Sequence, residues 1–110
     1  MGKTSRDKGK RGEREVAGLL RSYGYDARRG VQYHGGEDSP DVVGLNGMHI
    51  EVKRTEALRL YEALSQSKAD AGDDMPIVIH RKNNSEWVVI QPLEDWIELY
   101  RAWELEKGET

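Results

Sequence analysis

Three ionisable residues, Asp41, Glu51 and Lys53, occur in two short runs of strand-forming residues within the stretch 38–54. Two carboxylates held close together repel one another, so a fold tolerates them mainly where a cation lies between them or one is protonated. Oxygen ligands without cysteine favour a hard cation such as Mg²⁺ or Mn²⁺. A lysine beside that metal could hold or deprotonate a water, or neutralise charge that develops on a phosphate. The alternative is that these residues lie on the solvent-exposed face of an ordinary strand pair and have no catalytic role.

The register of a hairpin decides whether the two acids meet. A two-residue Asn46-Gly47 turn pairs Val42 with Glu51 and sends Asp41 to the other face of the sheet. A three-residue loop that begins at Leu45, with its glycine left-handed, pairs Asp41 with Glu51 instead. A bulge or bend before the strand would serve equally well. Convergence of the acids therefore requires the hairpin to leave its simplest register.

A further acid lies on the first predicted helix. Glu13 falls within the apolar stripe, one turn before Ala17 and two before Leu20, whereas Glu15 lies at its rim. An acid on the buried side needs a partner, and the metal site is a candidate. The alternative is an acid near the start of the helix that is favoured by the helix dipole.

Apolar periodicity and turn signals define the elements that must position these residues. The pattern predicts, in chain order, a helix over 8–23, a strand over 25–29, a flexible loop over 30–40, strands over 41–45 and 48–54, a helix over 56–71, strands over 76–82 and 86–91, and a helix over 92–106. The order αβββαββα, without repeat or linker, predicts one α/β domain over residues 1–110, with a mixed sheet flanked by helices.

Composition bounds the function. The 110 residues suffice for one modest core; 36% are hydrophobic, none is cysteine, and no apolar run is long enough for a bilayer span or a secretory signal. We therefore expect a cytoplasmic protein with no membrane partner and no disulfide or thiolate zinc site. The three histidines, His34, His49 and His80, lack zinc-ligand spacing. His49 is expected near the sheet surface opposite Glu51, and its role is open.

The net charge of −3 conceals an asymmetry. Residues 1–29 contain nine Lys/Arg against four Asp/Glu, whereas residues 30–110 contain eight against sixteen. A basic arm at 1–8 that lies along phosphates is one interpretation, and a solvated, disordered terminus is the other. The residues predicted to contact DNA are Lys8, Lys10, Arg11, Arg14, Arg29, Arg54, Arg81 and Lys82. The last helix and acidic tail occupy 92–110, and the part from Glu94 onward, with six acids and two bases, should avoid DNA.

At these positions the sequence resembles the PD-(D/E)XK nuclease superfamily. Pro40-Asp41 and Glu51-Val52-Lys53 match its motif, and residues 8–29 look like the first helix and strand of the branch that contains Holliday-junction resolvases and phage-type endonucleases. The resemblance implies that Asp41 and Glu51 bind Mg²⁺ or Mn²⁺, with the Val52 carbonyl completing the site. It also implies that Lys53 orients the attacking water and that Glu13 is the helix-borne acid.

The next helix carries a further match. The resemblance implies a catalytic role for Gln66 near the phosphate or the metal, whereas helical periodicity places Gln66 roughly opposite a stripe that includes Leu60 and Leu64. The loop over 30–39 is longer than in many resolvases and retains only Ser39 of the serine-bearing turn.

The resemblance implies a metal-dependent DNA endonuclease that acts on branched DNA or Holliday junctions as a homodimer. A phage-type nuclease, acting in the host cytoplasm on duplex or flap DNA without junction preference, is the second interpretation. A DNA-binding protein that keeps the fold without cutting is the third. Trp87, Trp96 and Trp103 are expected to pack the last strand and helix, with part of that surface available as a dimer face.

Overall fold

The computed structural model describes the backbone of residues 2–30 and 39–108, and the side chains of these residues from Asp7 onward. The elements follow the predicted order. They are α1 (Gly2–Ser22), β1 (Arg28–Arg29), β2 (Val42–Val43), β3 (Met48–Arg54), α2 (Leu60–Ala71), β4 (Met75–Arg81), β5 (Val88–Ile90) and α3 (Leu93–Glu106). None of the helices in these ranges combines the length and the apolar character needed to cross a bilayer.

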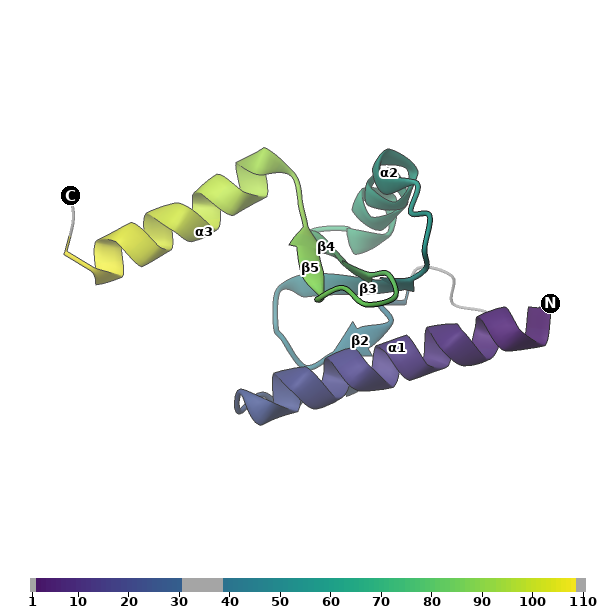
Figure 1. Ribbon diagram of the computed structural model, residues 1–110. Helices are drawn as coiled ribbons and strands as arrows, with labels where there is room; N and C mark the ends of the chain where they lie inside the picture. The colour runs from purple at the N-terminus through teal and green to yellow at the C-terminus, as the bar shows by residue number, and fades with distance from the viewer. Residues whose placement is uncertain (1, 31–38, 109–110) are drawn as a thin grey trace.

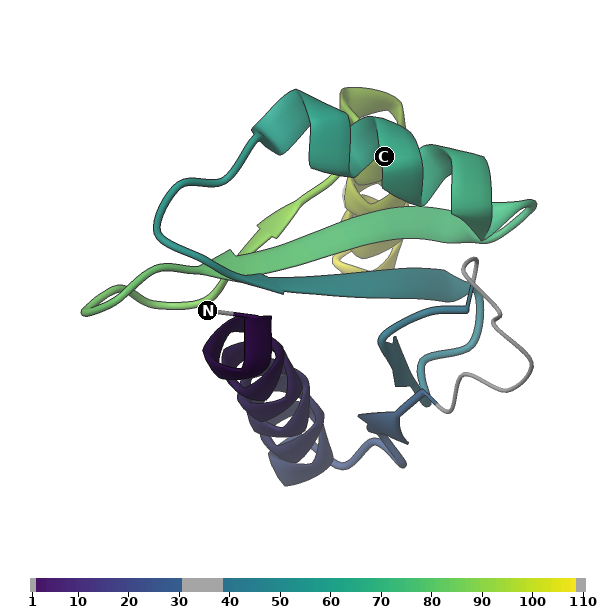
Figure 2. The ribbon, with the colours of Figure 1, turned by 90° about the vertical axis from the view of Figure 1, so that its right-hand side faces the viewer.

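The five strands form one mixed sheet in the order β1-β2-β3-β4-β5. β3 and β4 are parallel and joined through α2, whereas the other neighbouring pairs are antiparallel. Helix α1 lies on one side of the sheet and α2 on the other, as Figure 2 shows. The core fills the α1 side, where Val16 and Ala17 pack with Ile50 and Val52 of β3. The opposite face of β3, which carries Glu51 and Lys53, is turned toward α2.

The hairpin between β2 and β3 adopts the longer of the two loops considered above. Val42 pairs with Ile50, so the same register sets Asp41 opposite Glu51. The Met48 N–H donates to the Leu45 carbonyl at 3.1 Å, and Gly47 has a φ of 86°. The two-residue turn is therefore excluded, and the acids can meet.

A close approach between two segments fixes the start of β2. The Gly30 N–H donates to the Asp41 carbonyl at 2.8 Å, and the Asp41 N–H donates to the Ile50 carbonyl at 2.8 Å. A Cβ at Gly30 would lie 2.1 Å from the Pro40 carbonyl oxygen, which no side chain tolerates. The backbone of Asp41 is thus held from both sides, and Gly30 is the residue that permits it.

Several predicted boundaries are wrong. Helix α1 begins at Gly2 instead of residue 8, so residues 2–8 form the first turns of the helix and not a separate arm. Lys and Arg are good helix formers, and extending a helix that is already anchored costs little. Helix α2 begins at Leu60 instead of residue 56, because Glu56 accepts a hydrogen bond from the Asn83 backbone N–H and is held outside the helix.

The strands at one edge of the sheet are also shorter than predicted. β1 and β2 have two residues each, against predicted spans of 25–29 and 41–45. The Tyr25 N–H donates to the Leu20 carbonyl, which keeps the chain at the end of α1. The predicted loop over 30–40, including His34, lies largely outside the described residues.

Helix α3 extends away from the sheet (Figure 1), and none of its residues is buried. Trp96 and Trp103 are each 48% exposed, so the prediction that all three tryptophans pack the last strand and helix is wrong for these two. Trp87 packs against the core, and its Nε1–H donates to Glu15 at 2.7 Å. The cause is that no other element of the described chain covers the apolar face of α3.

Candidate active site

Asp41 and Glu51 form the centre of the candidate site. Asp41 Oδ2 accepts a hydrogen bond from the Val52 backbone N–H at 2.8 Å, and the register of β2 and β3 sets Asp41 directly opposite Glu51. Burial, together with the negative charge of Glu51, raises the pKa of Asp41 from 3.8 to about 7. Burial also raises the pKa of Glu51. Near neutral pH and without a cation, the pair therefore shares one proton.

Glu13 brings a third acid to the same place from α1. Burial raises the pKa of Glu13, and the charge of Asp41 adds to this, while a hydrogen bond from Arg29 opposes it. The Arg29 Nε–H donates to Glu13 Oε1 at 3.0 Å. The negative charge of Glu13 also contributes to the raised pKa of Glu51. Arg29 is thus the partner that a buried-side acid needs, and the three acids converge.

Lys53 lies on the same face of β3 as Glu51. Its positive charge lowers the pKa of both Asp41 and Glu51, which places the ammonium near both carboxylates. It also lines a pocket of about 210 Å³ between the end of β3 and α2. Gln66 lines the same pocket and is exposed to solvent, so it lies beside Lys53 and not on the far side of α2.

Gln66 does not lie where helical periodicity predicted, because α2 packs against the sheet through small residues. The residues of α2 that are buried are Ala63, Ser67 and Ala71. Leu60, a member of the predicted apolar stripe, is 39% exposed, and the neighbouring Tyr61 is 81% exposed. Small side chains let the helix approach the sheet closely, so the larger apolar residues are displaced to its flank.

The donor set fits a hard divalent cation. It consists of partly buried carboxylate oxygens with the backbone of Val52 beside them, and a cation would relieve the repulsion that adds to the effect of burial on the pKa of Asp41. The site therefore has the acids, the lysine and the electrostatic need that metal-assisted phosphodiester hydrolysis requires.

The comparisons with known proteins agree with this chemistry. The sequence profile of the archaeal Holliday junction resolvase (Hjc) family matches residues 4–102. This chain belongs to that family. The solved structure of Hjc from Archaeoglobus fulgidus, a Holliday junction resolvase from an archaeal hyperthermophile, is similar with a TM-score of 0.58 and 25% identity, over 76% of this chain and 72% of that one. Among curated proteins, none matches.

Family membership makes this chain a junction-resolving DNA endonuclease of the PD-(D/E)XK type. The mixed five-stranded sheet with its helices is the fold that the Archaeoglobus fulgidus structure shares.

Two residues of this resolvase that sequence reasoning missed lie against Glu51. His49 Nε2 is 2.9 Å from Glu51 Oε1, and the His49 residue is 4% exposed. A carboxylate oxygen of Asp70, near the end of α2, lies within 4.8 Å of both groups. The prediction that His49 lies near the opposite surface is wrong, because residues two apart on a strand share a face. That spacing was the available signal for His49, whereas Asp70 had none.

The basic residues predicted to contact DNA fall into two groups. Three of them pair within the chain: Arg29 with Glu13, Arg54 with Glu56, and Arg81 with Glu15 while it also stacks over Trp87. Lys8 lies 4.0 Å from Glu56, at the limit of an ion pair. Within residues 7–30 and 39–108, Lys10, Arg11, Arg14 and Lys82 are exposed and make no ion pair.

Proposed function

We propose that this resolvase hydrolyses phosphodiester bonds of four-way DNA junctions with Asp41 and Glu51 as the metal ligands. The observation that carries the proposal is that the register of β2 and β3 sets Asp41 opposite Glu51, with Lys53 on the same face of β3 as Glu51. Mg²⁺ is the expected physiological ion and Mn²⁺ a substitute, since oxygen ligands dominate. Because the substrate is DNA, we propose that the protein acts in the cytoplasm.

Each side chain has a distinct task in this proposal. Asp41 and Glu51 hold the ion, with the Val52 carbonyl as a third ligand. The bound ion would polarise the scissile phosphate and make a water more acidic. Lys53 orients the attacking water and stabilises the negative charge of the transition state. Glu13, restrained by Arg29, stands beside the pair as the helix-borne acid.

Gln66 has the most peripheral of these roles. Its side chain lines the pocket next to Lys53, where an amide could donate to a phosphate oxygen of the bound strand. We propose that Gln66 positions the substrate and takes no part in proton transfer.

The exposed face of α1 supplies DNA affinity in this proposal. Lys10, Arg11 and Arg14 present exposed cations on the helix that also carries Glu13, so a DNA backbone bound along α1 would run toward the acids. Lys82, in the turn after β4, adds a further cation. Arg29, Arg54 and Arg81 hold the fold together with their own acid partners and contribute less.

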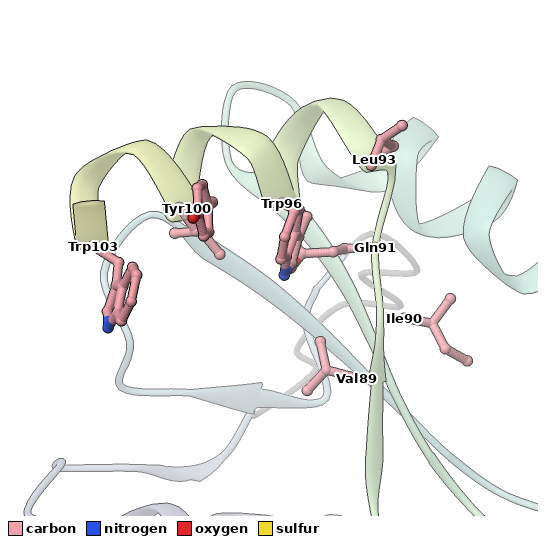
Figure 3. A pocket seen from close by; sticks show the side chains of 8 residues that line it. Val89, Ile90, Gln91, Leu93, Trp96, Tyr100 and Trp103 are labelled. Carbon is pink, nitrogen blue, oxygen red and sulfur yellow. The ribbon is translucent and has the colours of Figure 1, made fainter. Parts of the chain in front are cut away.

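We propose that the aromatic surface of α3 is the face through which two copies associate. Figure 3 shows Trp96, Tyr100 and Trp103 along one side of α3, with Gln91 beside Trp96 and Val89 below. Tyr100 lies 5.4 Å from Trp96 and 5.6 Å from Trp103, measured between ring centroids. These residues line an aromatic groove between β5 and α3. The acidic character of residues 94–110 makes DNA an unsuitable ligand for this groove.

A second copy of the chain is the occupant that fits. A second apolar hollow is lined by Leu19, Tyr23 and Trp87. Val89 lines both this hollow and the aromatic groove of α3, so one apolar surface extends from α1 to α3. A large exposed apolar surface of this kind is typical of an interface. A junction has two strands to cut, and a two-fold dimer would present two equivalent sites.

Cleavage of labelled DNA tests the function. Four-way, flap, duplex and single-stranded substrates are incubated with the protein in Mg²⁺, in Mn²⁺ and in chelator. We expect metal-dependent cutting of the four-way junction in preference to the others. Equal cutting of duplex and junction would favour the phage-type alternative without junction preference, and tight binding without cutting in either metal would overturn the catalytic proposal.

Sedimentation tests the dimer. Trp103→Arg places a charge in the aromatic groove and should convert a dimer to a monomer, whereas Tyr61→Arg, at an 81% exposed position on α2, should leave the dimer intact. A monomeric wild-type protein at micromolar concentration, or a dimer that Trp103→Arg does not weaken, would contradict this interface.

A further inference from the structure

His49, Glu51 and Asp70 form a second cluster of ligand atoms on the side of Glu51 that faces α2. The His49 imidazole nitrogen and one oxygen of each carboxylate lie within 4.8 Å of one another. The two elements that bring them together are β3 and the end of α2, which contact each other. His49 is 4% exposed and the Glu51 side chain 14%, while Asp70 is half-buried and gives access from solvent.

A hydrogen bond alone explains only part of this cluster. The contact of 2.9 Å between His49 Nε2 and Glu51 Oε1 accounts for those two groups. It leaves Asp70, which makes no ion pair among the residues that the structure describes, with a carboxylate oxygen within 4.8 Å of the Glu51 carboxylate. Two carboxylates around a shielded imidazole are better explained when a cation joins them.

We propose that His49, Glu51 and Asp70 bind a second divalent cation, of the transition-metal class that includes Mn²⁺, Co²⁺ and Zn²⁺. Imidazole nitrogen suits these ions and is a poor ligand for Mg²⁺. Metal–ligand distances near 2.0–2.2 Å put the ligand atoms around one ion about 3–4 Å apart, so a small movement of Asp70 completes the set.

Glu51 has the geometry to serve both sites. Its Oε1 faces His49, which leaves Oε2 for the ion shared with Asp41. A carboxylate that bridges two ions is the arrangement by which two-metal sites hold their ions a few ångströms apart. The inference shares Glu51 with the proposed function and is otherwise independent of it, because it concerns metal binding on the α2 side and not DNA cleavage.

Mn²⁺ binding by the metal-stripped protein, followed by EPR, tests the proposal. Free Mn²⁺ signals give the number of ions bound per chain, and pulsed EPR detects nitrogen coordinated to the ion. The variants are His49→Gln, Asp70→Asn and Asp41→Asn, with Asp73→Asn as the control because Asp73 is an exposed acid just beyond α2. Circular dichroism establishes that each variant is folded.

We expect the wild type and Asp73→Asn to bind Mn²⁺ with nitrogen coordination. His49→Gln should lose the nitrogen signal and one bound ion, and Asp70→Asn should weaken the same site by roughly 10-fold to 100-fold or more. Asp41→Asn should keep the nitrogen signal while it loses the other ion. A nitrogen signal in a protein that does not cut DNA would leave this site standing and overturn only the proposed function.

Two results would overturn the second site. One is a wild-type protein whose bound Mn²⁺ shows no nitrogen coordination, a result that needs no variant and is therefore unaffected by folding defects. The other is unchanged Mn²⁺ stoichiometry and affinity in both His49→Gln and Asp70→Asn, which would reduce His49 to a residue that positions Glu51.

Discussion

Asp41→Asn should stabilise the metal-free protein, although it removes a proposed catalytic group. The amide has the same size and can still accept the hydrogen bond from the Val52 N–H, but it carries no charge. The ionised carboxylate, in contrast, is desolvated and faces Glu51. The raised pKa of Asp41 is therefore a measure of how much its ionisation destabilises the folded state.

The magnitude follows from the pKa. The difference between 3.8 and about 7, at 1.36 kcal/mol for each pH unit, sets up to about 4 kcal/mol as the cost of ionisation in the folded protein. A folded-state pKa above the unfolded value means that the folded state holds the proton more tightly. The wild-type protein without metal should therefore lose stability as the pH rises from about 4 to about 7, with no further loss from this group above that range.

Thermal unfolding in chelator and in Mg²⁺, at several pH values, measures the effect. In chelator above pH 7, Asp41→Asn should unfold at a higher temperature than wild type, at roughly 4 °C for each kcal/mol, and the difference should vanish near pH 4. Mg²⁺ at 100 times its Kd should stabilise the wild type by about 2.7 kcal/mol and leave Asp41→Asn unchanged.

The control is Asp26→Asn, at a side chain that is 98% exposed, which should change neither the pH dependence nor the response to metal. A metal-free Asp41→Asn protein that is less stable than wild type at pH 8, or one that Mg²⁺ stabilises as much as wild type, would refute the reasoning about the acid pair.

The remaining predictions concern catalysis and DNA binding. Lys53→Ala should lower the single-turnover cleavage rate by about 100-fold to 1000-fold at saturating protein while junction affinity changes little, and equal rates would remove Lys53 from the mechanism. Cleavage by the wild type should increase with pH up to about 7, because the metal must displace the proton that Asp41 shares. Lys10→Ala and Arg14→Ala should each reduce the slope of log affinity against log salt by about 0.9, whereas Lys68→Ala, an exposed lysine on α2, should not.

Part of the site was predictable because it is local in sequence. The strand over 48–54 was predicted with the bounds that it has, and its period of two residues puts Glu51 and Lys53 on one face. The motif at Asp41 and Glu51 indicated the superfamily, and residues 8–29 indicated the branch to which the chain belongs. The position of Glu13 in a helical stripe likewise indicated an acid directed at the sheet.

Other features were decided by contacts between residues distant in sequence. The hairpin register depends on the approach of Gly30 to the chain at Pro40 and Asp41, which no local pattern contains. The position of Gln66 depends on which face of α2 packs against the sheet. That face carries small residues and not the larger apolar ones.

The sequence by itself determined the order of the elements, the chemistry of the acid pair and the basic character of the first helix, because each is a property of neighbouring residues. Only the tertiary structure decided that Arg29 pairs with Glu13, that Asp70 joins His49 and Glu51, and that α3 leaves its aromatic face uncovered. These outcomes depend on how helices and strands pack, and packing energies are shared among residues that the sequence separates.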